Sequence, residues 1–500
     1  MDDEPGIDIP GRLGLYQRLR FLVGDVVLYG GATAMSAAVG LVSFPVLARH
    51  FATQEFGLID LFSVLATLAT TMLVFGQDSA VARFFYEYSD TSNRKQVASQ
   101  ALAVQVALLL VFIPLMWLFA GRMAAALSNA GDAQLLLRLV ILQVPFLLLI
   151  NFSQNILKWT FARREFLVIS IGSSLLSVSA LLVGVLILKI DVVGVFVVFL
   201  ATRAIFAGLG VWFVRRWLVV PSDWGLAREM LPFALPLALI ASVSVLVPLV
   251  ERALVLGLVG DRDLGIYAAG ARVAMLIGLP VSAFQIAWGP FSLAIHKEVH
   301  AEHTYNSVLK AFTFIILTSV LALAAVAEPA IRLLASERYS GAAVVVFPIA
   351  MGLAVEGIGW ITAIGIGISK RSYLSLFGYA VYAVVAGLAI YLLVQPFGLI
   401  GAAWGLFLAH AGKSVVETFL AQRAYPCDWA FGAVLAACTV VAGIGLSMQF
   451  IVPRFGHGVM AMVDLLCVTV IPYIGARLMF SAAERLQMAE LLLWRPRSEP

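Results

Sequence analysis

Long apolar runs are the feature that most restricts how this chain can fold. A helix needs about 20 mostly apolar residues to cross the ~30 Å hydrocarbon core of a bilayer. In lipid, every backbone N–H group of a span must find its partner within its own segment, which favours helices. The runs therefore predict an all-α polytopic membrane protein with about 14 transmembrane helices. They cover approximately residues 24–48, 58–84, 97–119, 135–157, 166–188, 192–214, 231–259, 264–295, 305–327, 342–368, 373–394, 398–420, 431–452 and 458–479.

Composition excludes a large soluble enzyme. The chain is 62% hydrophobic and 12% charged, with a mean hydropathy of +0.98, whereas soluble domains are about 45–50% apolar and about 25% charged. The three cysteines, Cys427, Cys438 and Cys467, lack the spacing of a metal site or a disulfide framework. The N-terminus begins with acidic residues and lacks the pattern of a signal peptide, so we expect the first span to direct membrane insertion.

Lysine and arginine set the expected orientation, because cytoplasmic loops are enriched in them. With the N-terminus in the cytoplasm, the loops place 20 of these residues inside and 8 outside, and 5 lie within spans. The bias predicts that both termini are cytoplasmic. The net charge of +4 follows from the same bias and does not suggest nucleic acid as a partner.

Short matches recur at an offset of about six spans. "PVLARHFATQEFGL" from Pro45 has a counterpart in "PLVERALVLGLVGDRDLGIY" from Pro248. The glycines Gly57 and Gly265 are 208 residues apart, and Gly194 and Gly401 are 207 residues apart. An even number of spans preserves topology, so the pattern predicts two parallel repeats, a plan that places transporter sites at the repeat interface. The expected parts are an N-terminal lobe (1–218), a C-terminal lobe (219–425), two added spans (426–480) and an amphipathic cytoplasmic tail (481–500).

The repeated stretches also resemble a family. "FPVLARHFATQEFGLIDLF", "FGQDSAVARFF" and "LGIYAAGARVAMLIGLPVSAFQIAWGPF" are similar to Wzx-type polysaccharide flippases. These belong to the multidrug/oligosaccharidyl-lipid/polysaccharide exporter superfamily. The resemblance covers the whole chain, but its motifs are degenerate and indicate the superfamily better than the substrate.

The resemblance implies two six-helix lobes around a central cationic cavity. It implies alternating access that flips an oligosaccharide on undecaprenyl pyrophosphate from the cytoplasmic to the outer leaflet, for exopolysaccharide, capsule or O-antigen synthesis. The implied partners are this lipid-linked oligosaccharide, membrane lipid and the polymerase and chain-length machinery. A multidrug/cation antiporter of the same superfamily is an alternative. A membrane-embedded polymerase or ligase is a third possibility, although the outer loops are short for an enzyme, and we expect no enzymatic activity.

Charged residues within the runs are the candidate site, because a charge at the bilayer centre is costly unless it faces a partner or a wet cavity. Arginine suits a diphosphate, since its planar fork binds phosphate oxygens bidentately. Depth along the runs groups Arg203, Arg252 and Arg272, and we expect these three to line one cavity. The full set of cationic candidates is Arg49, Arg83, Arg203, Arg252, Arg272, His410 and Lys413.

The acidic residues of the runs leave two interpretations open. Asp78, Glu251 and Glu356 are candidates for coupling transport to a proton or sodium gradient. Alternatively, the charges pair with one another as fixed contacts between helices, for example Arg252 or Arg272 with Glu356. No resident cofactor or metal is expected.

Overall fold

The computed structural model describes most of the chain. The described residues are 42–88, 90–127, 131–221, 224–296, 301–369 and 371–450, with single residues at 31–39, 298, 300 and 466–480. Most of the first expected run, nearly all of the last and the expected amphipathic tail (481–500) lie outside this part.

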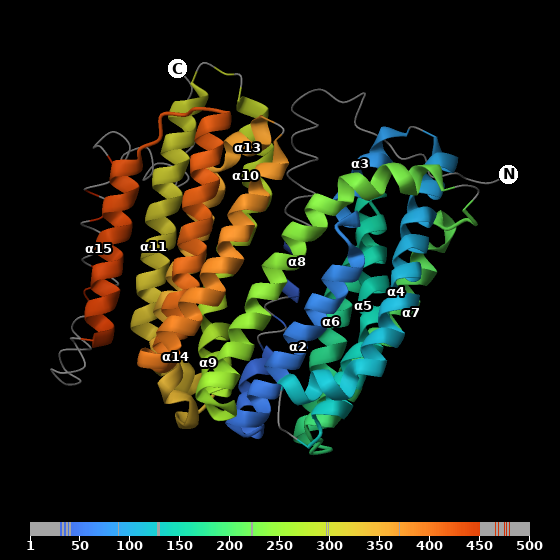
Figure 1. Cartoon of the computed structure of the whole chain (residues 1–500), viewed down its shortest axis with the longest axis horizontal. Coiled ribbons are helices and arrows are strands. Elements are labelled where there is room, and N and C mark those ends of the chain that lie inside the picture. Colours follow the sequence, from blue (N-terminus) through green and yellow to red (C-terminus); the bar gives the residue numbers. More distant parts are fainter. Residues whose placement is uncertain are drawn as a thin grey trace, which may run out of the picture. The chain divides into compact units, whose positions relative to one another are not determined.

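The described chain contains helices and no strands, as expected for spans in lipid. Eleven of its helical segments are long and apolar enough to cross a membrane. The helices, labelled in Figure 1 where space allows, are α2 (Thr53–Val74), α3 (Gln77–Glu87), α4 (Thr91–Leu127), α5 (Ala133–Trp159), α6 (Arg163–Leu186), α7 (Val192–Val214), α8 (Gly225–Val259), α9 (Asp261–Ala274), α10 (Gly278–Ile295), α11 (Ala301–Leu334), α12 (Ala343–Thr362), α13 (Ile364–Ile368), α14 (Ser375–Ala424) and α15 (Phe431–Phe450).

Two turns of the described chain decide how the expected runs correspond to the helices. The run 58–84 is divided into α2 and α3, because Phe75 and Gly76 adopt positive φ angles of 55° and 63°. The runs 373–394 and 398–420 correspond to the two legs of α14, which a sharp turn at Gly398, with a φ of 57°, separates. Its two legs pack together, since a Cβ on Gly405 would meet the backbone nitrogen of Ile390 at 2.7 Å. The total of fourteen spans stays a prediction.

Contacts divide the chain into two compact units, residues 1–268 and 269–500. This boundary differs from the one at residue 218 that the repeat suggested. The reason is that α8, which the repeat assigns to the second half, packs against α2, α3 and α4. The ranges of the repeats themselves stay a prediction.

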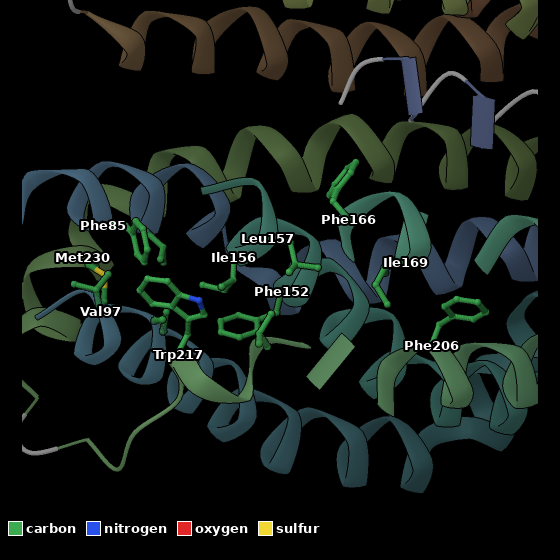
Figure 2. Packing of buried hydrophobic residues seen from close by; sticks show 14 of the residues in the cluster. Phe85, Val97, Phe152, Ile156, Leu157, Phe166, Ile169, Phe206, Trp217 and Met230 are labelled. Carbon is green, nitrogen blue, oxygen red and sulfur yellow. The ribbon is translucent and has the colours of Figure 1, made fainter. Parts of the chain in front are cut away.

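An aromatic cluster holds one end of the first unit together. Phe85 of α3 lies 5.6 Å from Trp217 and 5.8 Å from Trp159, measured between ring centroids. Figure 2 shows the indole of Trp217 beside Phe85 and Phe152, while Phe166 and Phe206 lie further along the same cluster. Burying such rings stabilises the bundle and fixes the helices that carry the polar sites described next.

Candidate functional site

In the first unit, Arg252 of α8 is part of a buried ion-pair network. Its side chain is almost fully buried, with the residue 3% exposed. Its Nε donates to Oδ2 of Asp60 at 2.7 Å, and its Nη1 lies 3.2 Å from Oε2 of Glu251. Tyr267 of α9 donates its hydroxyl hydrogen bond to the other oxygen of Glu251. This arrangement compensates the arginine charge within the protein and leaves the guanidinium no open face toward a ligand.

Asp60 was not identified from the sequence as a candidate site residue. A close contact between two glycines explains why Asp60 reaches Arg252. Gly57 and Gly265 are each the fifth residue of their helices, α2 and α9. They lie against each other, since a Cβ on Gly57 would meet the nitrogen of Gly265 at 2.8 Å. Contact between a residue and its own repeat counterpart is typical of a local two-fold relation. The repeat could therefore have identified Asp60. This residue follows the matched Gly57 by one helical turn and lies where α2 crosses α9.

Arg203 of α7 has a different environment. It is the middle residue of its helix. It donates a hydrogen bond to the amide oxygen of Gln143 in α5, and its guanidinium lies 5.2 Å from the ring centroid of Phe199. Among the residues that the structure describes, no carboxylate pairs with Arg203. A neutral amide and an aromatic ring leave its positive charge uncompensated.

Arg203 also lines a pocket of the first unit. The pocket has a volume of about 290 Å³. Its polar lining is Arg203 and four serines, and its apolar lining is Leu147, Ile150, Val178, Leu181 and Phe199. Three of the serines, Ser173, Ser174 and Ser177, lie on one face of α6 at helical spacing. Arg252 does not line this pocket.

The second unit contains a compensated cluster on α12 and α14. Lys413 Nζ donates to Oε1 of Glu356 at 2.5 Å. His410 Nδ1 lies 3.2 Å from Oε2 of the same carboxylate, a distance typical of an ion pair. Lys413 and His410 are buried, whereas the Glu356 side chain is 22% exposed. Within the second unit, Glu356 thus has Lys413 and His410 as partners. Its pairing with Arg252 or Arg272, which the sequence left open, stays a prediction.

Aromatic groups and a second acid complete this cluster. The Lys413 ammonium lies 4.3 Å from the ring centroid of Tyr379, in the other leg of α14. The Tyr382 hydroxyl is 3.5 Å from His410 Nε2. Glu417, one turn beyond Lys413, is buried against Gly378. The sequence pointed to His410, Lys413 and Glu356, but not to the tyrosines, which lie about a whole span away along the chain.

The structure places the remaining candidates along the chain, although the side chain of Asp78 lies outside its described part. Arg49 and Arg83 are exposed. Arg272 lies on the part of α9 that belongs to the second unit and is partly buried. Asp78 lies on α3. That Arg272 shares a cavity with Arg203 therefore stays a prediction, whereas Arg252 does not line the pocket of Arg203. No group of acidic, histidine or cysteine residues among those described is arranged to hold a metal ion.

Comparison with solved structures shows the fold. The lipid II flippase MurJ in an inward closed conformation superposes with a TM-score of 0.70 at 14% identity, covering 94% of this chain and 100% of that one. An inward-facing multidrug resistance MATE family transporter of the MOP superfamily gives a TM-score of 0.61 at 18% identity, covering 86% and 98%. MATE in a bent conformation gives 0.60 at 16% identity, covering 84% and 96%.

Sequence comparison shows the family. No curated protein is significantly similar to the chain in sequence. The model of a family described as "Polysaccharide biosynthesis protein" matches residues 22–292, more than half of the 500 residues. The resemblance stated from the repeated stretches is confirmed at this level. The chain is a multi-pass membrane protein with the fold of the MOP superfamily, and it belongs to the polysaccharide biosynthesis protein family.

Proposed function

We propose that this protein flips a lipid-linked oligosaccharide across the bacterial inner membrane. The substrate is an oligosaccharide repeat unit on undecaprenyl pyrophosphate, carried by alternating access from the cytoplasmic to the outer leaflet. Both termini are cytoplasmic in this proposal, and the exported unit then passes to a polymerase and its chain-length machinery. The family match supports a role in polysaccharide biosynthesis. The similarity in fold to a lipid II flippase supports transport of a lipid-linked substrate.

The uncompensated charge of Arg203 is the single observation that carries this proposal. A charge at the middle of a span costs at least ~2.5–3.5 kcal/mol unless something compensates it. Arg203 has only Gln143 and Phe199 as described partners, so an anionic substrate is the compensation that its position favours. The diphosphate of the carrier is a further anion. It belongs near the headgroups, where the exposed Arg49 and Arg83 are the candidates.

The acidic residues of the second unit support coupling of transport to an ion gradient. Glu356 and Glu417 lie near one lysine and one histidine, so the cluster combines two acidic with two basic side chains. Proton binding at this cluster is our proposal for the energy source, with sodium as the alternative ion.

A drug or cation antiporter is the second candidate function. The similarity to multidrug MATE transporters and the two carboxylates of the second unit favour it. A polymerase or ligase receives less support, because the solved structures that resemble the chain are those of a flippase and of transporters.

Deletion of the protein in its native host tests the function. We expect lipid-linked repeat units to accumulate, inaccessible to a membrane-impermeant periodate label added outside, while polymer export stops and recovers on complementation. Unchanged export together with increased retention of ethidium would indicate the antiporter instead. Repeat units that accumulate on the outer face would indicate a polymerase.

A further inference from the structure

The serines of the Arg203 pocket present hydrogen-bond acceptors to its interior. A hydroxyl has one donor hydrogen and two acceptor lone pairs. Ser173 and Ser174 donate their hydrogens to the carbonyl oxygen of Ser170, at 3.1 and 3.3 Å. Ser177 donates to the hydroxyl oxygen of Thr202 at 3.0 Å. Because these hydroxyl hydrogens already form bonds within the protein, the α6 serines can offer a ligand only their lone pairs. Lone pairs accept hydrogen bonds from donors such as sugar hydroxyls.

Arg203 adds donors to the lining of the same pocket. Arg203 gives one N–H to Gln143, and its other N–H groups have no acceptor among the residues that the structure describes. The Gln143 amide is itself fixed, since its Nε2 donates to the carbonyl oxygen of Phe196 at 3.1 Å. The Phe199 ring lies against the guanidinium. These contacts hold the guanidinium in place, where an oxyanion can be bound without reorganising the side chain.

The volume of the pocket limits how much of a glycan it can hold. At about 290 Å³ it is at the lower end of the ~300–1,000 Å³ range of small-molecule sites. Its apolar walls, which include Leu147 and Val178, suit the C–H faces of a sugar ring. One ring fits this space, whereas an oligosaccharide repeat unit does not.

We infer that this pocket binds one acidic sugar residue, a hexuronate, of the transported glycan. Its carboxylate binds Arg203, and its hydroxyls donate to Ser173, Ser174 and Ser177. A neutral sugar would leave Arg203 uncompensated. A diphosphate has only hydrogen-bond acceptors. It could not donate a hydrogen bond to the serine oxygens of α6, which are acceptors too. The inference rests on the proposed function and specifies which part of the substrate the first unit holds.

Ligand-observed NMR on the full-length protein in lipid nanodiscs tests this inference, with glucuronate, glucose and inorganic pyrophosphate as probes. We expect glucuronate to bind at least about tenfold more tightly than glucose, and pyrophosphate not to displace it. Arg203→Gln should weaken glucuronate binding by about tenfold or more, the effect of losing a charge-assisted hydrogen bond. The double variant Ser174→Ala/Ser177→Ala should weaken glucuronate and glucose alike.

Arg215→Gln is the matched control. Arg215 follows the last residue of α7 and also stacks on an aromatic ring, that of Trp212, but does not line the pocket. Its substitution should leave glucuronate binding unchanged. The thermal unfolding midpoint of each variant shows that the protein is folded.

Three results would overturn the inference: no glucuronate binding, binding that Arg203→Gln leaves unchanged, or displacement of glucuronate by pyrophosphate through Arg203. The last would make the pocket a diphosphate site. Glucuronate binding in a protein whose deletion does not trap lipid-linked units would refute the proposed function and leave the site intact. Trapped units without glucuronate binding would refute only this inference.

Discussion

Arg252 and Arg203 are two arginines of the same unit with opposite electrostatic environments. Arg252 is enclosed by Asp60, Glu251 and Tyr267. Arg203 has an amide and an aromatic ring as partners and faces a pocket. Both were candidates from their depth in the sequence, and depth does not distinguish them. The two arginines differ in whether a carboxylate lies beside them. An arginine paired with carboxylates holds helices together, whereas an arginine without such a partner favours binding of an anionic ligand.

Removing Arg252 should have the largest effect on stability. Arg252→Met leaves Asp60 and Glu251 as buried carboxylates without their cation, which costs about 3–5 kcal/mol. We expect a lower unfolding midpoint in detergent and less protein in the membrane. Adding Asp60→Asn to the same variant should recover part of the loss. Normal stability combined with lost export would make Arg252 a binding residue and abolish the contrast with Arg203.

Removing Arg203 should affect export rather than stability. Arg203→Met removes a charge that has no carboxylate partner, so we expect the unfolding midpoint to be unchanged or slightly higher. Losing a charge-assisted contact to the substrate should cost roughly 1.5–3 kcal/mol of binding, about tenfold to over a hundredfold. Arg203→Lys should be intermediate, because lysine keeps the charge but loses the fork. Polymer export normalised to membrane protein measures this, and equal losses of export and abundance would contradict it.

The glycine contact that brings Asp60 toward Arg252 provides a steric test. Gly57→Ala would place a Cβ 2.8 Å from the backbone nitrogen of Gly265. Overpacking of this kind costs about 1–3 kcal/mol, so the unfolding midpoint should fall. Gly208→Ala is the control, because a Cβ there meets nothing within 4 Å. If both variants are equally stable, the close crossing of α2 and α9 is not what holds the Arg252 network together.

Removing Lys413 extends the comparison to the second unit. We expect this substitution to have a smaller effect than the others. Lys413→Met leaves Glu356 without its ammonium partner, but Glu356 is 22% exposed and keeps His410. We expect a loss of about 1–2 kcal/mol, between the costs of breaking an exposed and a fully buried pair. Chemical unfolding in detergent measures it. If Lys413→Met lowered the free energy of unfolding as much as Arg252→Met, the partial exposure of Glu356 to solvent would not reduce the cost of leaving its charge without the lysine.

The sequence by itself determined the architecture. The length and apolarity of the runs required helices, because a bilayer offers backbone groups no other partners. Twelve of the expected runs correspond to described helices or to a leg of α14. The repeat matched Gly57 with Gly265, and these two residues do lie in contact.

Only the tertiary structure decided which charges are compensated. Asp60 and Arg252 are 192 residues apart in the chain, and Lys413 and Glu356 are 57 apart. Such pairs form where helices cross, and the crossing depends on small contacts such as that between Gly57 and Gly265. Helical periodicity places a residue along a helix and on one of its faces. It does not identify the neighbouring helix, and that neighbour determines whether an arginine such as Arg203 meets a carboxylate or a pocket.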